Sequence, residues 1–373
     1  MKKILYVILA AMILLASCND DGYVTGVKAP SGEDQLVERI DGRVVLAYAT
    51  YYGAAVPNAA FFTHLNYAFA EPYMAGDEYA GIGLQGSEAR FQQIVDLKKR
   101  HPELKICISF TNSKEDPRGG CFSQLAKRDE YRKAFAADCK AFVQKWGIDG
   151  VDMDWEFPGL SWSGDANAYD VAVDVDNHVR LMAQLRETLG NSYLLTYAGY
   201  CMGKTPVAGG SRYIDIAAVN PYVDFVNIMT YDLDESPRHQ SALYDPAAYS
   251  DCTRAVQTYL SAGMPAGKLV LGIPFYGRHS FSTAPLSINY KNIITLDPQQ
   301  YKIDNWDDAA SVPYVTHKGE YYAGYDNERS IAVKGDWLLA KGMAGMMYWD
   351  YDGDDSSGTL LKAVWNVVMK KRE

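Results

Sequence analysis

Eight short apolar runs of strand-like composition constrain the fold of this chain more than any other feature, because stretches with helical spacing separate most of them. The runs cover residues 44–49, 64–70, 105–110, 150–157, 193–200, 224–231, 269–276 and 345–349. Eight buried strands that alternate with helices predict a (β/α)8 TIM barrel. An open, doubly wound sheet is the alternative, but no GxGxxG follows the first run.

The intervals between the runs add detail to this prediction. Residues 123–146 and 175–189 have helical spacing, and Gly190 is placed to end the second helix. Residues 279–325 form an interval too long for a simple connection, and they are rich in Tyr. We interpret them as a small α+β insertion between strands 7 and 8, beside a cleft, with a long decorated loop as the alternative. The predicted barrel domain is 41–373.

The N-terminus has the pattern of an export signal. Lys2 and Lys3 precede an apolar run over residues 4–15, which is too short for a spanning helix. The sequence LASC at 15–18 resembles a bacterial lipobox, so we expect residues 1–18 to be a lipoprotein signal peptide and Cys18 to be lipidated. An ordinary signal peptide is the alternative. Residues 19–40 are expected to be a tether, and the protein to be lipid-anchored in the outer membrane of the cell envelope, with surface exposure suggested by Asn-Asp-Asp at 19–21.

The composition argues against several classes of binding partner and ligand. A net charge of −10 argues against nucleic acid and against binding to an anionic membrane surface. Five cysteines follow Cys18, an odd number without a CxxC pair, and six histidines are scattered without metal-binding spacing. We therefore expect no metal, no cofactor and no disulfide framework. The expected assembly is a monomer.

The stretch DGVDMDWEFPG at 149–159 carries the chemistry. If it is a strand, Asp152, Asp154 and Glu156 lie on one face at intervals of about 6–7 Å, and the apolar side chains lie on the other. Like charges this close raise one another's pKa, so a stable protein needs a reason to keep them. Asp149 lies off this alternation and is interpreted as structural, whereas Trp155 faces away from the acids and is interpreted as core.

Other polar and aromatic residues end predicted strands, and the carboxyl ends of barrel strands form the active-site face. They are Phe69, Glu71, Tyr231, Asp232, Tyr276, Arg278 and Trp349. Each has a structural explanation when taken alone, but their convergence on one rim favours a site.

With these residues in view, the chain from residue 41 onward resembles glycoside hydrolase family 18, the chitinases and their relatives. DGVDMDWE matches the DxxDxDxE signature of that family. Five further segments agree in order: LNYAFA, MTYD, GIPFYGR, YDNERSI and GMAGMMYW, at 65–70, 229–232, 272–278, 325–331 and 342–349. Three acids in one row are awkward for flanking a bond from opposite sides, which suits the substrate-assisted route better than two flanking carboxylates.

The resemblance implies roles for single residues. Glu156 would protonate the glycosidic oxygen, and the 2-acetamido group of the substrate would attack the anomeric carbon to give an oxazolinium intermediate. Asp154 would orient the acetamido N–H with Asp152 sharing its proton and charge, and Tyr231 would hydrogen-bond the acetamido group. The family also implies a sugar-binding set. It comprises Trp349, Phe69, Met229, Asp232, Tyr276 and Arg278.

The third strand departs from the family, which commonly has SxGG where this chain has Ser-Phe-Thr-Asn at 109–112. A bulky Phe110 in this stretch leaves the form of the neighbouring subsites open. The expected substrate is an oligo- or polysaccharide containing N-acetylglucosamine, such as chitin or chitooligosaccharides, cleaved at β-1,4 bonds with retention. An endo-β-N-acetylglucosaminidase acting on N-glycans is one alternative. A lectin on the same barrel is another, although such proteins usually lose the acid that Glu156 provides.

Overall fold

The computed structural model describes residues 37–112, 122–159, 170–199, 207–208, 211–248 and 250–371. The predicted signal peptide, Cys18 and most of the predicted tether lie outside these ranges. Within them, no helix has the length and apolarity needed to cross a membrane.

The core of the fold is a closed barrel of eight parallel strands. In chain order the barrel strands are β1 (Val44–Thr50), β2 (His64–Ala75), β4 (Lys105–Thr111), β5 (Gly150–Asp154), β6 (Leu194–Gly199), β9 (Phe225–Ile228), β10 (Leu269–Pro274) and β16 (Gly345–Trp349). Each pairs with its neighbour, and β1 closes the barrel by pairing with both β16 and β2. The predicted (β/α)8 fold is therefore confirmed. The antiparallel strand β3 (Glu78–Leu84) extends the sheet beyond β2.

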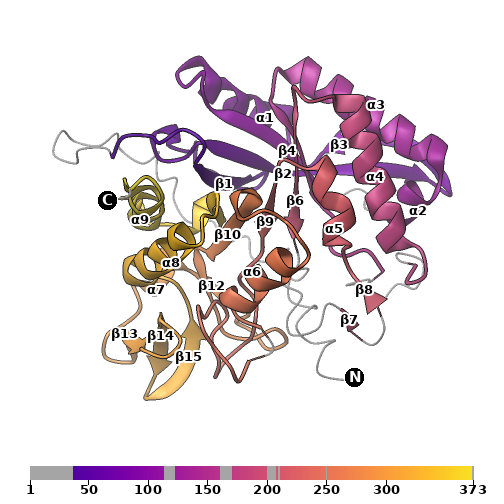
Figure 1. Cartoon of the computed structure of the whole chain (residues 1–373). Helices are drawn as coiled ribbons and strands as arrows, with labels where there is room; N and C mark the ends of the chain where they lie inside the picture. The colour runs from indigo at the N-terminus through magenta and orange to yellow at the C-terminus, as the bar shows by residue number, and fades with distance from the viewer. Residues whose placement is uncertain are drawn as a thin grey trace.

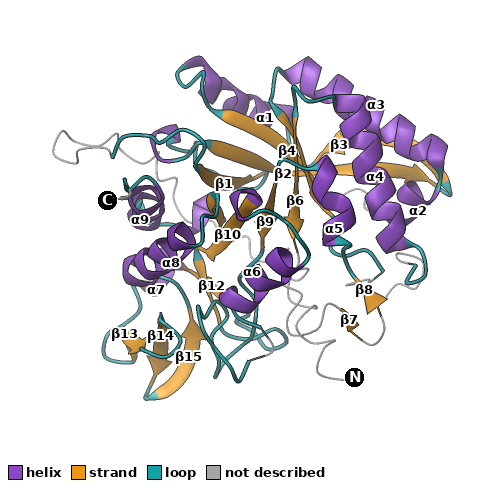
Figure 2. Cartoon of the chain, in the orientation of Figure 1, coloured by secondary structure: helices purple, strands orange, loops and turns teal. Residues whose placement is uncertain are grey.

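Helices surround the strands, as Figures 1 and 2 show. They are α1 (Glu88–Val95), α2 (Phe122–Lys127), α3 (Asp129–Trp146), α4 (Asp174–Leu189), α5 (Ile216–Val219), α6 (Cys252–Ser261), α8 (Glu328–Ala340) and α9 (Thr359–Val368). The single helix expected at 123–146 is two helices, because Arg128 has an extended backbone and the acids Asp129 and Glu130 begin a new helix. The helix α4 ends at Gly190, which has a φ of 72°, as expected for a C-terminal glycine.

A second sheet lies beyond the barrel strand β10. It contains β11 (Tyr276–Arg278), β12 (Ser287–Asn289), β13 (Tyr301–Asp307), β14 (Val312–His317) and β15 (Glu320–Gly324). The short helix α7 (Tyr290–Ile293) accompanies this sheet, so the segment between barrel strands 7 and 8 is an α+β unit, seen at the lower left of Figure 1. Two antiparallel strands of two residues each, β7 (Val207–Ala208) and β8 (Ser211–Arg212), follow β6.

Alternate residues of the barrel strands form two different cores. One set faces the helices and builds the large outer core, which includes Val151 and Met153 of β5. The other set fills the barrel interior with Val44, Leu46, Tyr48, Ala68, Phe225, Val270, Ala344 and Met347. Phe69, Met229, Tyr231 and Trp349 pack on the upper end of this inner core. The apolar interior therefore supports the predicted rim from below.

Candidate active site

The strand β5 carries the acid row, but it ends at Asp154 rather than at 157 as expected. Glu156 therefore lies two residues beyond the strand, at the mouth. The chain leaves the sheet here because Trp155 is buried in the helix layer, where it stacks on Phe122 with 5.6 Å between ring centroids. Trp155 is thus a core residue, as predicted. The alternation of faces places Asp152 and Asp154 in the barrel interior, both nearly inaccessible to solvent.

Asp152 accepts four hydrogen bonds from neutral side chains around the barrel. The donors are the hydroxyls of Tyr48 at 2.8 Å, Ser109 at 2.8 Å and Thr196 at 2.5 Å, and the amide of Asn227 at 3.2 Å. Burial raises the pKa of Asp152, while these four hydrogen bonds oppose the rise. The sequence did not single out these four partners, which come from four strands, β1, β4, β6 and β9.

Asp154 and Glu156 form a hydrogen-bonded pair of carboxyls above Asp152. Burial, then the charges of Glu156 and Asp152, raise the pKa of Asp154 well above its usual value. A hydrogen bond between the two carboxyls raises the pKa of Asp154 further and lowers that of Glu156. Burial and the charge of Asp232 nevertheless raise the pKa of Glu156 to about 7. The pKa of each carboxyl is therefore raised, and that of Glu156 lies near neutrality.

Tyr231 belongs to the loop that follows β9, not to the strand predicted over 224–231. Burial raises its pKa, helped by Tyr276 and by the charges of Asp154 and Glu156, so the phenol stays neutral and able to donate. Gly272 of β10 makes room for this ring, because a Cβ at that position would lie 2.9 Å from Cε1 of Tyr231.

The aromatic rim lies over the inner core. The rings of Phe69 and Trp349 stack with 5.6 Å between centroids, and Tyr48 approaches Trp349 at 5.5 Å. Tyr231 and Tyr276 meet edge to face at 6.3 Å. These contacts bring the predicted aromatic residues to one end of the barrel.

Asp232 and Arg278 form a bidentate ion pair beside Tyr231. The guanidinium donates to both carboxylate oxygens, at 2.8 and 2.9 Å, and its side chain is almost fully buried. Tyr276 and Arg278 lie on β11, the first strand of the second sheet, rather than on the barrel strand predicted to reach 276. That sheet therefore contributes directly to the rim.

Two further residues lie outside the row. Asp149 forms ion pairs with Lys98 and Lys105 and accepts from the backbone N–H of Ile106, so it is structural, as predicted. Phe110, where the third strand departs from the family pattern, belongs to the outer core. Its buried ring packs edge to face on Phe135 at 5.1 Å, in the helix layer, while Ser109 faces the interior and donates to Asp152.

Nothing in the described part of the chain suggests a metal centre. Over these residues, no group of three or more His, Cys, Asp or Glu side chains is arranged to hold an ion. The buried carboxyls instead face neutral donors and one another, which is a proton-handling arrangement.

Comparison with known proteins identifies the family. The model of glycosyl hydrolases family 18 matches residues 44–354. The chain belongs to glycosyl hydrolase family 18. Chitinase A1 of Niallia circulans is 32% identical in an alignment 311 positions long that covers 70% of this chain and 42% of that protein. Chitinase 1 of Aphanocladium album is 28% identical in an alignment 328 positions long that covers 79% of this chain and 72% of that protein.

A solved structure agrees with this assignment. The family 18 N-acetylglucosaminidase from Paenibacillus barengoltzii superposes with a TM-score of 0.72 at 26% identity, covering 87% of this chain and 99% of that one. The match to Chitinase A1 spans less than half of that relative, so this chain corresponds to only a part of it.

Proposed function

We propose that this family 18 member is a retaining glycosidase that cleaves β-1,4 linkages of N-acetylglucosamine-containing glycans, with chitin or chitooligosaccharides as substrate. The observation that carries the proposal is the row of carboxyls at one end of the barrel, in which the hydrogen-bonded Asp152 lies below Asp154 and Glu156. The relatives named as chitinases support the substrate class.

Glu156 is the general acid in this proposal. With a pKa of about 7 it keeps its proton at and below neutral pH, and it lies at the mouth where a glycosidic oxygen can reach it. It protonates the leaving oxygen as the acetamido carbonyl oxygen attacks the anomeric carbon, so the glycosidic bond breaks and an oxazolinium ion forms. Glu156, now ionised, then takes a proton from water, which opens the ring from the face the leaving group vacated and retains the configuration.

Asp154, Asp152 and Tyr231 act on the acetamido group. Asp154 accepts the acetamido N–H and stabilises the developing positive charge, for which its proton must move toward Asp152 or away from the pair. The four donors on Asp152 hold that second carboxylate in place. The neutral phenol of Tyr231 donates to the acetamido oxygen and aligns it for attack.

Trp349, Phe69, Met229, Tyr276, Asp232 and Arg278 form the sugar-binding wall in this proposal. The Trp349 ring offers a face to the apolar side of a pyranose. Asp232 presents a fixed carboxylate to sugar hydroxyls, because the buried guanidinium of Arg278 holds it in position.

The test is a product analysis with a matched variant. The wild type and Glu156→Gln are incubated with N-acetylchitooligosaccharides and with an N-glycoprotein, and products are identified by mass. Release of N,N′-diacetylchitobiose by the wild type alone supports the proposal, and release of single N-acetylglucosamine units would indicate an N-acetylglucosaminidase, the activity named for the solved relative. Cleavage within the N-glycan core alone would identify N-glycans, rather than chitooligosaccharides, as the substrate. Binding without turnover would favour a lectin.

We further propose that Cys18 carries a lipid that anchors the protein in the outer membrane of a bacterial envelope. The support is the LASC sequence at 15–18 after an apolar run. Expression in a bacterium fed labelled palmitate, with Cys18→Ala as the control, should label the wild type only. Equal labelling of both would contradict the anchor.

A further inference from the structure

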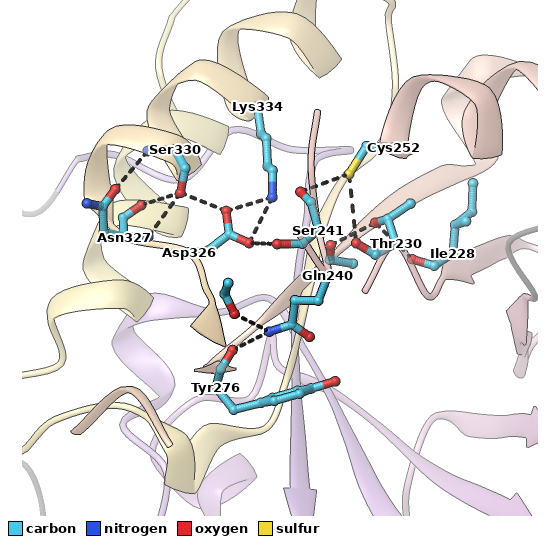
Figure 3. Close-up of polar contacts among 12 residues, drawn as sticks. Ile228, Thr230, Gln240, Ser241, Cys252, Tyr276, Asp326, Asn327, Ser330 and Lys334 are labelled. Atoms are coloured by element: carbon cyan, nitrogen blue, oxygen red, sulfur yellow. Dashed lines mark hydrogen bonds and ion pairs between the residues drawn. The ribbon is translucent and has the colours of Figure 1, made fainter. Parts of the chain in front are cut away.

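A buried ion pair near the second sheet accepts a hydrogen bond from a segment that is distant in sequence (Figure 3). Lys334 of α8 donates to both oxygens of Asp326 at 2.6 and 2.8 Å, and neither side chain is exposed to solvent. Ser330 adds a local hydrogen bond to Asp326 at 2.7 Å. Ser241 adds a long-range one at 2.5 Å from the loop between β9 and α6. Asp326 therefore anchors that loop to the start of α8.

Gln240, next to Ser241, connects this anchor to the rim. Its side-chain amide donates to the backbone oxygens of Tyr276 at 2.7 Å and Gly324 at 3.2 Å, which join β11 and β15 (Figure 3). Its backbone oxygen accepts from the N–H of Leu233 at 2.9 Å. Leu233 directly follows Asp232, so one buried residue holds both the Tyr231–Asp232 segment and the Tyr276 backbone.

From these contacts we propose that Gln240 is a positioning residue, which fixes the distance between the loop after β9 and β11 and is itself held by the Ser241–Asp326–Lys334 anchor. This inference rests on the proposed function, since it assigns Gln240 a role in aligning Tyr231 with the acetamido group. Gln240 touches no reacting atom; it acts through Tyr231, Asp232 and Tyr276.

Two features favour a positioning role over ordinary packing. A buried ion pair is weak evidence for stability, since well-packed apolar residues can replace it, but its directional bonds can select one arrangement of the loops it joins. Tyr231 and Asp232 follow the end of β9 and lie in a loop, so their position depends on contacts with the second sheet, and Gln240 supplies these contacts together with the Asp232–Arg278 ion pair. The acetamido group must meet the anomeric carbon in a narrow range of geometries, and an error of about 1 Å can cost about 100-fold in rate.

The experiment compares Gln240→Met with Asn305→Leu. Methionine preserves the approximate size of Gln240 but removes both donors. Asn305 is the matched control, because its amide also donates to two backbone oxygens, those of Lys302 and Tyr314, but within the second sheet at the β13–β14 pair. We expect kcat on chitooligosaccharides to fall about 10- to 100-fold in Gln240→Met with KM within about threefold, and to stay near the wild-type value in Asn305→Leu.

A second measurement separates positioning from loss of folded enzyme. Calorimetric titration with a thiazoline analogue of the oxazolinium ion gives affinity and stoichiometry together. For Gln240→Met we expect full stoichiometry and an affinity weakened in parallel with kcat. A stoichiometry that falls with kcat, or a wild-type kcat in Gln240→Met, would overturn the proposal.

Ser241→Ala tests the anchor. It removes the long-range hydrogen bond to Asp326, and we expect a loss in kcat of about two- to tenfold that is not additive with Gln240→Met, because both act on one loop. Additive losses would show that the anchor does not act through Gln240. A wild type that neither hydrolyses chitooligosaccharides nor binds the thiazoline would instead refute the proposed function, so the two failures are distinguishable.

Discussion

Two groups of buried carboxylates in this molecule are stabilised by different kinds of partner. Asp326 has a lysine ammonium on both oxygens and two serine hydroxyls beside it. In the acid row, Asp152 has four neutral donors, and one oxygen of Asp154 has no hydrogen-bond partner among the described residues. Within the described part of the chain, no lysine or arginine forms an ion pair with Asp152, Asp154 or Glu156.

The difference in partners indicates a structural role for Asp326 and a chemical role for the acid row. A buried carboxylate with a cation stays ionised and serves as a fixed joint between segments. A row of carboxylates without a cation has raised pKa values, and protons can move within it near neutral pH. Substitution of Asp326 or Lys334 should therefore mainly change the free energy of unfolding. Substitutions in the acid row should mainly change the rate of catalysis.

The largest effect is expected from Lys334→Met. This change leaves the Asp326 carboxylate buried without its cation, which should lower the free energy of unfolding by about 3–5 kcal/mol. Urea unfolding followed by tryptophan fluorescence measures it. The double variant Asp326→Leu with Lys334→Met is the control and should recover most of the loss. A loss below about 1 kcal/mol in the single variant would contradict a structural role for the ion pair.

Asp154→Asn should show the opposite pattern. The amide keeps the size of the side chain but cannot stabilise the positive charge of an oxazolinium ion, so we expect kcat to fall about 100- to 1000-fold. The free energy of unfolding should be unchanged or higher, because an amide need not take up a proton on burial as a carboxyl with a raised pKa does. Asp149→Asn is the matched control from the same stretch of chain. It breaks ion pairs with Lys98 and Lys105, so stability should fall while kcat stays near wild type.

The acid row also shows what the sequence could predict. Alternation along a strand was enough to assign Asp152 and Asp154 to one face and Trp155 to the other, because side-chain direction in a strand has a period of two. The barrel followed from eight apolar runs, because parallel strands covered by helices are buried on both faces. Glu156, Tyr231 and Tyr276 were found by pattern although all three lie beyond the ends of the barrel strands.

The partners of these residues could not be predicted in the same way. The donors to Asp152 lie on four strands, and which of them meet depends on the stagger between strands, which an apolar pattern does not specify. Lys334 lies in a helix of mixed composition, where a lysine ordinarily indicates a solvent-exposed position. Only the approach of Asp326 and Ser241 gives it a buried role.

The pH profile sharpens the comparison. Glu156 must be protonated to act as an acid, and its raised pKa keeps the proton on up to about pH 7. We therefore expect kcat/KM to fall about tenfold per pH unit above pH 7. Initial rates on a chitooligosaccharide between pH 5 and 9 measure this limb. A fall that begins below pH 5 would show that the row does not raise the pKa of its terminal acid.

The smallest expected effect is a gain in stability from Glu156→Gln. The pKa of Glu156 is about 7 in the folded chain against an ordinary value of 4.5, so the stability linked to its proton is full below pH 4.5 and is lost as pH rises through 7. Glutamine does not titrate. Glu156 is partly accessible at the mouth, and solvent reduces the effect of its pKa shift on stability. We therefore expect the free energy of unfolding of the variant to exceed that of the wild type by about 1–2 kcal/mol at pH 8 and to differ little at pH 4.

Urea unfolding at both pH values measures this gain, with Glu187→Gln on the exposed surface of α4 as the control. The control should behave like wild type at both pH values. A gain in Glu156→Gln that is equal at pH 4 and pH 8 would come from packing rather than from charge. A gain confined to high pH would show that the row gives up stability to hold a proton near neutrality.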